Sequence, residues 1–443
     1  MARGAAAPRP ALAGGALVVA GAGLGATTAL TITAESVSQL TAAGGLATFA
    51  GNLTGMAGTY LALLMVMLVS RIPFIESVFG QDGLLRWHRR LAPWPISLLV
   101  AHAVLITAGY AQAARVGPWH EAGTLFLYYP DILAATVGLG LICLAGVISV
   151  RAIRRRVRRE IWWTVHLYLY LALAISFAHV IVLGPSFTNH RLTQVVWSAA
   201  WAGTAGVVLA YRVGLPVFRS FWYRLQVAEV RPEGPGVVSI TCRGQHLDRL
   251  AVSGGQFFFW RFLTRDMWWQ AHPYTLSSLP QPPYLRLTVK GVGDHSAALA
   301  RLQPGTRVAI EGPYGTFTRL SQRRAHVVLI AAGIGVTAVR ALLEDLPRST
   351  RPAVILRATR RADLALGTEI ADLVKRRGGQ LHEVTGDRLT ASIDQYSLRH
   401  LVPDVRERDV YICGPEGFVT SVVEVAKSLG IPDEAIHHEA YAL

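Results

Sequence analysis

The first half of the sequence has no lysine and few acidic residues. Residues 1–220 contain 16 Arg and 6 Asp or Glu, and all 3 Lys of the chain lie after residue 220. Charged residues make up only 16% of the 443 residues, whereas 52% are hydrophobic, which excludes an ordinary soluble globular protein. The arginines cluster at the ends of apolar runs instead of lining one face. This distribution is typical of membrane topology and argues against a nucleic-acid partner.

Cysteine is scarce as well. Cys143, Cys242 and Cys413 lie far apart in the sequence. Their number and separation exclude a disulfide framework and any zinc or iron–sulfur site with four cysteine ligands.

Six stretches are long and apolar enough to cross a bilayer, which takes about 20 residues. They are residues 11–32, 45–69, 91–112, 130–150, 162–184 and 193–215. The first resembles a signal peptide, but it is longer than the apolar region of one and further spans follow, so we expect a membrane helix. Arginines gather after the second, fourth and sixth spans. The positive-inside rule therefore places both termini in the cytoplasm, in a multi-pass protein of the cell membrane.

After Tyr223 the hydrophobic pattern changes twice. Up to about residue 322, short segments in which apolar and polar residues alternate are separated by Gly and Pro turns, which predicts strands. From about Ala325, apolar strands alternate with helical segments, which predicts a parallel α/β sheet. We therefore expect three domains, at residues 1–218, 219–322 and 323–443.

Four histidines fall on just two of the expected spans. His88 and His102 lie 14 residues apart on the third, and His166 and His179 lie 13 apart on the fifth. Fourteen residues make nearly four helical turns, about 21 Å of rise, so two such helices could hold two haems between axial histidines. Because the two helices run in the same direction, His88 pairs with His166 near the cytoplasm and His102 with His179 near the outer face.

Two alternatives stay open for this region. The four histidines could instead bond to backbone carbonyls or line a proton path. A spacing of 13 leaves two rings about 140° apart on an ideal helix, so either the fifth helix is overwound or bent, or the two haem planes are rotated. Arg89 and Arg90 could pair with haem propionates or serve only as topology charges.

The paired histidines and the segment RIPFIESVFGQDGLLRWHRRL (residues 71–91) resemble the ferric reductase and NADPH oxidase superfamily, bacterial members in particular. The resemblance extends over about residues 45–443. It implies two b-type haems with His88, His102, His166 and His179 as iron ligands.

A second motif begins at His272-Pro273 and continues through Tyr274-Thr275 to Ser277. It resembles the flavin motif of the ferredoxin–NADP reductase family in its ferric reductase variant, and implies an antiparallel β-barrel domain that binds FAD. Tyr274 supplies an aromatic ring for the isoalloxazine and Thr275 a hydroxyl near its reactive nitrogen. His-Pro replaces the usual Arg partner of the pyrophosphate. A turn with Gly293, His295 and Ser296 could supply that partner, because it opens a helix that Ser296 would cap.

The segment Gly333-Ile334-Gly335-Val336-Thr337 follows an apolar strand and opens a helix. Its glycines permit close approach of a dinucleotide pyrophosphate to the helix N-terminus, and it has the family's Gly-x-Gly-x-Thr form. The next strand ends at Thr359-Arg360-Arg361, and arginine there suits the 2′-phosphate of NADPH. Asp363 follows shortly and would suit the free ribose of NADH, so NADPH is favoured and NADH is possible. The alternative is a solvated charged loop.

Two further sites rest on the resemblance. It places Cys413-Gly414-Pro415 beside the nicotinamide and makes Tyr441 an aromatic cover on the flavin, so that Cys413, Tyr441 and Thr275 are the expected catalytic residues. The alternatives are that Cys413 is a small core residue and that Tyr441 merely packs.

The patterns and resemblances together predict a multidomain membrane protein with a six-helix transmembrane haem bundle, an antiparallel β-barrel FAD-binding domain and an α/β parallel-sheet nucleotide-binding domain. We expect NADPH to reduce FAD in the cytoplasm, and two b-type haems to carry single electrons to an extracytoplasmic acceptor, a ferric chelate or oxygen. One alternative is an electron-transfer subunit that supplies a separate extracytoplasmic partner protein. Another is a nucleotide-sensing transporter without haem.

Overall fold

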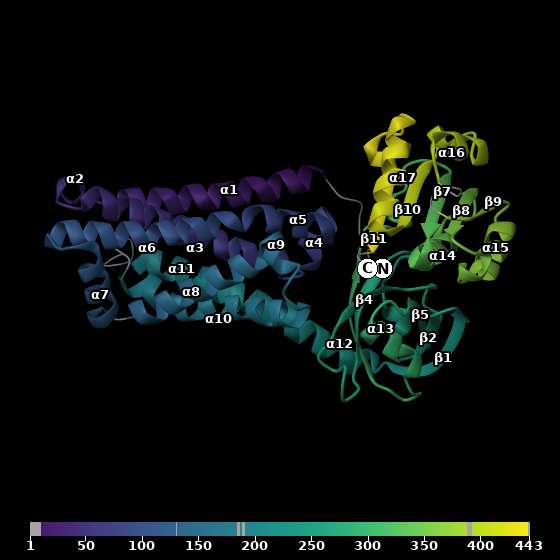
Figure 1. Ribbon diagram of the computed structural model, residues 1–443, viewed down its shortest axis with the longest axis horizontal. Helices are drawn as coiled ribbons and strands as arrows, with labels where there is room; N and C mark the ends of the chain where they lie inside the picture. Colours follow the sequence, from purple (N-terminus) through teal and green to yellow (C-terminus); the bar gives the residue numbers. More distant parts are fainter. Residues whose placement is uncertain (1–9, 130, 184–186, 188–190, 388–391, 442–443) are drawn as a thin grey trace. The chain divides into compact units, whose positions relative to one another are not determined.

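The computed structural model describes residues 10–129, 131–183, 187, 191–387 and 392–441. These residues group into two units. A helical unit contains the described residues of 10–75 and 81–212, and a mixed α/β unit contains those of 76–80 and 213–443. Figure 1 labels the elements of both units, and each unit is described below by itself.

The first half of the chain is helical throughout. Its helices are α1 (Pro10–Thr33), α2 (Val37–Thr41), α3 (Gly45–Val69), α4 (Pro73–Phe79), α5 (Gln81–Leu91), α6 (Pro93–Ala114), α7 (Pro118–Tyr128), α8 (Ile132–Ser149), α9 (Arg151–Arg154), α10 (Arg159–Leu183), α11 (Arg191–Val208) and α12 (Leu215–Tyr223). In the helical unit α3 packs along α6 and α8 along α10, and the four run alongside one another (Figure 1).

Six helical segments among the described residues are long and apolar enough to cross a membrane, which confirms the six expected spans. They are Gly14–Thr33, Gly45–Val69, Gly83–Ala114, Ile132–Ser149, Ile161–Val182 and Arg191–Tyr223.

Two of these spans are longer than the hydropathy pattern predicts. The third begins at Gly83, because α5 continues into α6 across Ala92, whose backbone stays helical at φ −50° and ψ −37°. The break between the two helices coincides with Pro93, which lacks an N–H and is tolerated in the first turn of α6. The sixth runs through a π-helical turn at Leu209–Gly214 into α12.

The antiparallel strands of the mixed unit form two three-stranded sheets. One has the order β1 (Gln226–Gly234), β2 (Val237–Arg243), β5 (Tyr284–Lys290), and the other β4 (His272–Thr275), β3 (Phe257–Phe262), β6 (Val308–Tyr314). Single bridges, Gln226 to Arg307 and Leu276 to Leu287, join their edges. The described antiparallel strands therefore group into two sheets that meet at both pairs of edges through single bridges, and the expected barrel is not confirmed as one continuous ladder. The pairings of β1 with β2 and of β3 with β6 also contain register shifts, as at β-bulges.

The remaining strands form a five-stranded parallel sheet. Its order is β11 (Ile436–Tyr441), β10 (Asp409–Pro415), β7 (Val327–Ala332), β8 (Pro352–Ala358), β9 (Gln380–Thr385). Every residue of β7 is buried, as is typical of a central parallel strand covered on both faces. The helices that follow the strands are α14 (Val336–Asp345), α15 (Gly367–Arg376), α16 (Gln395–Leu401) and α17 (Glu416–Ser428). From β7 the chain adds β8 and β9 on one side of the sheet, and then β10 and β11 on the other side of β7. The carboxyl ends of β7 and β10 therefore form a topological switch point, where ligands commonly bind.

An ionic network joins the antiparallel strands to the parallel sheet. Arg286 of β5 donates two hydrogen bonds of 2.7 Å to the carboxylate of Glu369 on α15, and Arg340 Nε on α14 donates to the same carboxylate at 2.9 Å. Arg340 also pairs with Glu344, which accepts a hydrogen bond from the Leu279 N–H at 2.9 Å. The hydrogen bond from Arg286 is the main cause that holds the pKa of Glu369 below its ordinary value. This network keeps α14 and α15 next to β5.

Replacing Glu369 with Gln should destabilise the mixed unit, because two arginines lose a shared anion. Charge-assisted hydrogen bonds contribute about 1.5–3 kcal/mol, and partial exposure places this network at the low end. A carboxylate with a lowered pKa stabilises the fold above its unfolded pKa, and that contribution is lost as pH falls through the folded pKa. Thermal unfolding of the full chain should therefore separate the variant from wild type near neutral pH and bring them together in acid. Glu434→Gln, at an exposed carboxylate, is the control; equal stability of Glu369→Gln and wild type at neutral pH would contradict the prediction.

Candidate functional site

The helical unit brings four histidines together as two facing pairs. The ring centroids of His88 and His166 lie 6.2 Å apart, and those of His102 and His179 lie 6.1 Å apart. The ring planes cross at 62° in the first pair and 65° in the second. An imidazole nitrogen lies about 2 Å from a metal that it coordinates, and the radius of each ring adds to this on both sides. Each pair is therefore separated by the distance that one metal ion between two imidazoles requires.

In each histidine pair, the ring that comes first in the sequence, His88 on α5 or His102 on α6, has its Nδ1 near a carbonyl of α3. His102 Nδ1 lies 2.8 Å from the Gly51 carbonyl oxygen, and His88 Nδ1 lies 3.4 Å from that of Met65. When Nδ1 donates its proton to a carbonyl, Nε2 is left to bind a metal, as in most metal-ligating histidines. The ring of His102 fits against α3 because residue 55 is glycine, since a Cβ there would lie 2.5 Å from His102 Nδ1.

The histidines of α10 lack such bonds. Nδ1 of His166 and Nδ1 of His179 are buried and have no hydrogen-bond partner among the described residues. The spacing of 13 left open a bent or overwound helix or two rotated haem planes. The structure shows α10 as one α-helix from Arg159 to Leu183, and the break lies at Ala92, between α5 and α6. No group of three or more His, Cys, Asp or Glu in the described part of the chain could hold a bare metal ion. The pairs therefore fit a metal that a flat cofactor carries, such as haem.

The two segments expected to contact FAD lie side by side in the mixed unit. The ring of His272 stacks on that of His295 with centroids 3.8 Å apart, and the Tyr274 hydroxyl lies 3.3 Å from His295 Nδ1. Ser277 Oγ is buried and has no hydrogen-bond partner among the described residues, so an atom of a bound cofactor could satisfy it.

Ser296 was expected to precede a helix and cap its N-terminus, but it lies inside the first turn of that helix. The helix α13 (Asp294–Ala298) has Gly293 at its N-cap, and Ser296 lies three residues later. There its hydroxyl accepts hydrogen bonds from the N–H groups of Gly293 at 3.1 Å and Val292 at 3.0 Å. The extended backbone of Gly293 starts the helix earlier than the pattern indicated, so the serine closes the turn from inside.

The glycine loop between β7 and α14 is shaped by two contacts. A Cβ on Gly335 would overlap the carbonyl oxygen of Cys413, so glycine lets this turn rest against the end of β10. Gly333 has a φ of +55° and open space where a Cβ would be, which leaves its backbone accessible to a ligand. Thr337 Oγ1 donates to the Ile334 carbonyl at 2.9 Å and closes the turn.

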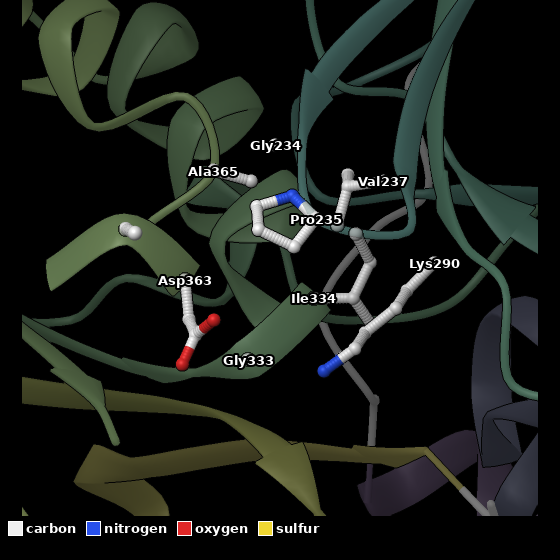
Figure 2. Close-up of a pocket in the computed structure, with 9 residues that line it drawn as sticks. Gly234, Pro235, Val237, Lys290, Gly333, Ile334, Asp363 and Ala365 are labelled. Carbon is white, nitrogen blue, oxygen red and sulfur yellow. The ribbon is translucent and has the colours of Figure 1, made fainter. Parts of the chain in front are cut away.

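A crevice opens in front of this loop. It is lined by Gly234, Pro235, Val237, Lys290, Gly333, Ile334, Ala362, Asp363 and Ala365. Figure 2 shows the Lys290 ammonium and the Asp363 carboxylate extending to the same side of the crevice as Gly333. Sequence reasoning missed Lys290, although it is one of only 3 lysines and ends a strand.

The two arginines expected at the 2′-phosphate already have carboxylate neighbours. Arg360 Nε lies 3.4 Å from Asp363, and Arg361 Nε lies 3.0 Å from Glu383. Both arginine side chains are mostly exposed, as is Thr359. The loop therefore presents two cations to solvent whose ionic partners an incoming phosphate could replace.

The three expected catalytic residues meet at the carboxyl ends of β10 and β11. Thr275 Oγ1 lies 3.1 Å from the Tyr441 hydroxyl, which also bonds the Cys413 side chain. Burial raises the pKa of the Cys413 thiol well above its ordinary value, and the charge of Glu439 adds to this. Burial likewise raises the pKa of Tyr441. Both groups therefore stay protonated at neutral pH.

Glu439 is the residue of this cluster that sequence reasoning missed. It pairs with Cys413 across the two parallel strands. The signal was present, because residues two apart on a strand share a face and Glu439 precedes Tyr441 by two.

The sequence matches two family models. Residues 54–177 match the ferric reductase like transmembrane component, and residues 223–318 match the FAD-binding domain. The chain is thus a multi-pass membrane protein with one segment similar to a ferric reductase transmembrane component and another similar to a FAD-binding domain. The transmembrane match includes His88, His102 and His166 and ends two residues before His179.

Several curated proteins resemble parts of the chain. The NADPH oxidoreductase of Mycobacterium tuberculosis is 29% identical over 185 residues, which are 40% of this chain and 48% of that protein. The ferric/cupric reductase transmembrane component 1 of Candida albicans is 22% identical over 307 residues, 67% of this chain and 38% of its own length. The chain spans about half the length of most of the first curated relatives it matches.

A solved structure also aligns with part of this chain. It is the flavohem-like FAD/NAD binding domain of nitric oxide dioxygenase from Vibrio cholerae. The two share 22% identity with a TM-score of 0.42, and the alignment covers 49% of this chain and 98% of that one.

Tyr441→Ala should make Cys413 reactive toward a thiol alkylating reagent. Burial is the main cause of the raised thiol pKa, and each unit by which that pKa falls raises the thiolate fraction about tenfold. Labelling of the native full chain, read by mass spectrometry, should be negligible at Cys413 in wild type and rise at least about tenfold in the variant. Tyr396→Ala removes an 80% exposed tyrosine and should change nothing. Unchanged labelling in Tyr441→Ala would show that this side chain does not cover the thiol.

Proposed function

We propose that this chain is an NAD(P)H-dependent transmembrane oxidoreductase. It takes electrons from cytoplasmic NADPH, with NADH as a possible substitute, and delivers them to an acceptor on the outer face, a ferric chelate or oxygen. The observation that carries the proposal is the presence of two facing histidine pairs in a chain that also contains a FAD-binding domain. When bound, FAD would accept a hydride and release single electrons, and two b-type haems would carry single electrons across the bilayer.

Under this proposal the chain divides into three domains. Residues 1–218 form the haem domain, 219–322 the FAD domain and 323–443 the NAD(P) domain. The arginine distribution, with 16 Arg and 6 acidic residues before residue 221, supports cytoplasmic termini. His88 and His166 then form the inner pair, and His102 and His179 the outer pair.

At the flavin, the chain supplies packing and hydrogen bonds. Tyr274 offers its ring to the isoalloxazine, and Thr275 Oγ1 is held by the Tyr441 hydroxyl at 3.1 Å. Tyr441 covers the site until the nicotinamide displaces it, and this cover excludes water. The Cys413 thiol is kept neutral by burial and borders the same site from β10. His272, Pro273, His295 and Ser277 complete the cofactor contacts.

The nucleotide phosphates are placed by the loop after β7. The turn Gly333–Gly335 leads directly into the N-terminus of α14, where free backbone N–H groups and the helix dipole favour a pyrophosphate. Lys290, which lines the same crevice and extends its ammonium toward Gly333, adds a cation. Arg360 and Arg361 recognise the 2′-phosphate, which replaces the carboxylates of Asp363 and Glu383 as their ionic partner.

Histidine variants test this assignment. His166→Leu and His179→Leu should each lower the haem content of the purified full chain from two per chain to one, because one axial ligand of one pair is lost. NADPH should still reduce the remaining haem in His179→Leu but not in His166→Leu, since only the first keeps the inner pair. Haem assay and NADPH-dependent difference spectra measure both effects. His120→Leu, at an exposed histidine on α7, should keep two haems.

A wild-type protein that carries no haem would contradict the proposed function. The inner-to-outer order would be contradicted if NADPH still reduced the remaining outer haem in His166→Leu, or no longer reduced the remaining inner haem in His179→Leu. The acceptor is identified in sealed vesicles supplied with NADPH, where superoxide indicates oxygen and ferrous iron indicates a ferric chelate.

Replacing Arg360 and Arg361 together with Ala should weaken NADPH binding much more than NADH binding. Each lost charged contact costs about 1.5–3 kcal/mol, which is at least a tenfold loss of affinity. Titration of both nucleotides against the full chain measures the ratio, and Arg399→Ala at an exposed arginine is the control. An equal loss for the two nucleotides would show that these arginines do not read the 2′-phosphate.

A further inference from the structure

Trp162 lies directly against one of the paired histidines. Its ring stacks on that of His166, with centroids 4.9 Å apart and 24° between the planes. The indole Nε1 donates a hydrogen bond of 3.0 Å to Ser149 Oγ at the end of α8, and Ser149 in turn donates to the Ala145 carbonyl at 2.6 Å. The indole is therefore tied to a neighbouring helix at one edge while its face meets the imidazole.

The four paired histidines are not held in the same way. His88 and His102 each have a carbonyl of α3 near Nδ1, whereas Nδ1 of His166 and of His179 has no hydrogen-bond partner among the described residues. A metal-ligating histidine commonly has its ring orientation set by a bond from its second nitrogen. At His166 the stacked indole takes the place of that bond.

Arg154 differs from its neighbours in the same loop. Its guanidinium carbon lies 4.6 Å from the centroid of a Trp162 ring, and its Nη1 donates to the Val157 carbonyl at 3.3 Å. Arg154 is half-buried, whereas Arg151, Arg155, Arg156 and Arg158 are exposed. A charge that served only membrane topology would be solvated like Arg151, Arg155 and Arg156, but this one is held over an aromatic face, where a cation is attracted.

We propose that Trp162 is a positioning residue for His166, and that Arg154 acts through it on the inner haem site. The indole fixes the plane of the His166 ring and so the angle at which it meets His88. The guanidinium places a positive charge close to the inner site and not to the outer one, which favours the reduced state of the inner site. The inference rests on the proposed function, because it concerns residues around the proposed haem ligands.

Substitutions at two adjacent tryptophans test the positioning role in the full chain. Trp162→Leu removes the stack, Trp162→Phe keeps an aromatic face, and Trp163→Leu changes a neighbour that is 46% exposed. Low-temperature EPR of the ferric protein is the readout, because the signal of a bis-histidine haem depends on the angle between its two imidazole planes. We expect Trp162→Leu to shift the inner signal alone, and Trp162→Phe and Trp163→Leu to keep the wild-type spectrum.

A second pair of variants tests the charge. Arg154→Gln should lower the midpoint potential of the inner haem in a spectroelectrochemical titration and leave the outer one unchanged. Arg155→Gln, at an exposed arginine of the same loop, should leave both potentials at their wild-type values.

The outcomes are distinct. Wild-type EPR spectra in a Trp162→Leu protein that holds two haems would overturn the positioning role, as would equal shifts in Trp162→Leu and Trp163→Leu. Should Trp162→Leu lose the inner haem, Trp162→Phe decides: an intact spectrum supports the inference, and loss in both variants assigns the tryptophan to folding and overturns it. Unchanged potentials in Arg154→Gln would overturn the role of the charge. Failure of the proposed function itself is recognised by a wild-type protein without haem.

Discussion

A buried imidazole inside an apolar helix is costly unless its polar atoms find partners, and the helical unit is organised around four of them. Two have Nδ1 near carbonyls of α3, and at His102 the absence of a side chain on Gly55 lets α3 come close enough. The other two face the first pair across a gap of about 6 Å between ring centroids. The packing of α3, α6, α8 and α10 therefore serves one requirement, which is to hold two pairs of rings at a fixed separation in a medium without water.

The mixed unit meets a different requirement, because its site is assembled from strands that are distant in sequence. Thr275 comes from an antiparallel strand, while Cys413 and Tyr441 come from adjacent parallel strands. The hydroxyls of Thr275 and Tyr441 and the thiol of Cys413 can meet only if the antiparallel strands keep a fixed position against the parallel sheet. The network of Arg286, Glu369 and Arg340 provides such a tie, and its anion is shared between two cations.

The arginines of this chain have different kinds of neighbour, and the neighbour of each arginine indicates its role. Arg360 and Arg361 are exposed and lie next to carboxylates that a phosphate could replace. Arg340 is buried in an ionic network, so its loss would leave the partly exposed carboxylate of Glu369 without one of its arginine partners. Arg154 is held over an indole instead of a carboxylate. The same residue type therefore serves recognition, structure and, in our inference, the tuning of a redox site.

The sequence by itself determined the features that depend on local composition and period. Six apolar stretches of sufficient length predicted the six membrane helices, and the spacing and direction of four histidines predicted which rings face each other. The strand-turn-helix pattern likewise located the glycine loop after β7. These follow from residues close together in the chain, so hydrophobicity and helical geometry suffice to read them.

Only the tertiary structure decided which distant side chains meet. It showed that Glu439 borders Cys413, that Lys290 lines a crevice together with the glycine loop and that Trp162 of α10 donates a hydrogen bond to Ser149 of α8. It also grouped the antiparallel strands of the expected barrel into two sheets whose edges meet at single bridges, an arrangement that depends on pairing between segments far apart in the chain. Such contacts depend on the register of one element against another, which no local pattern encodes.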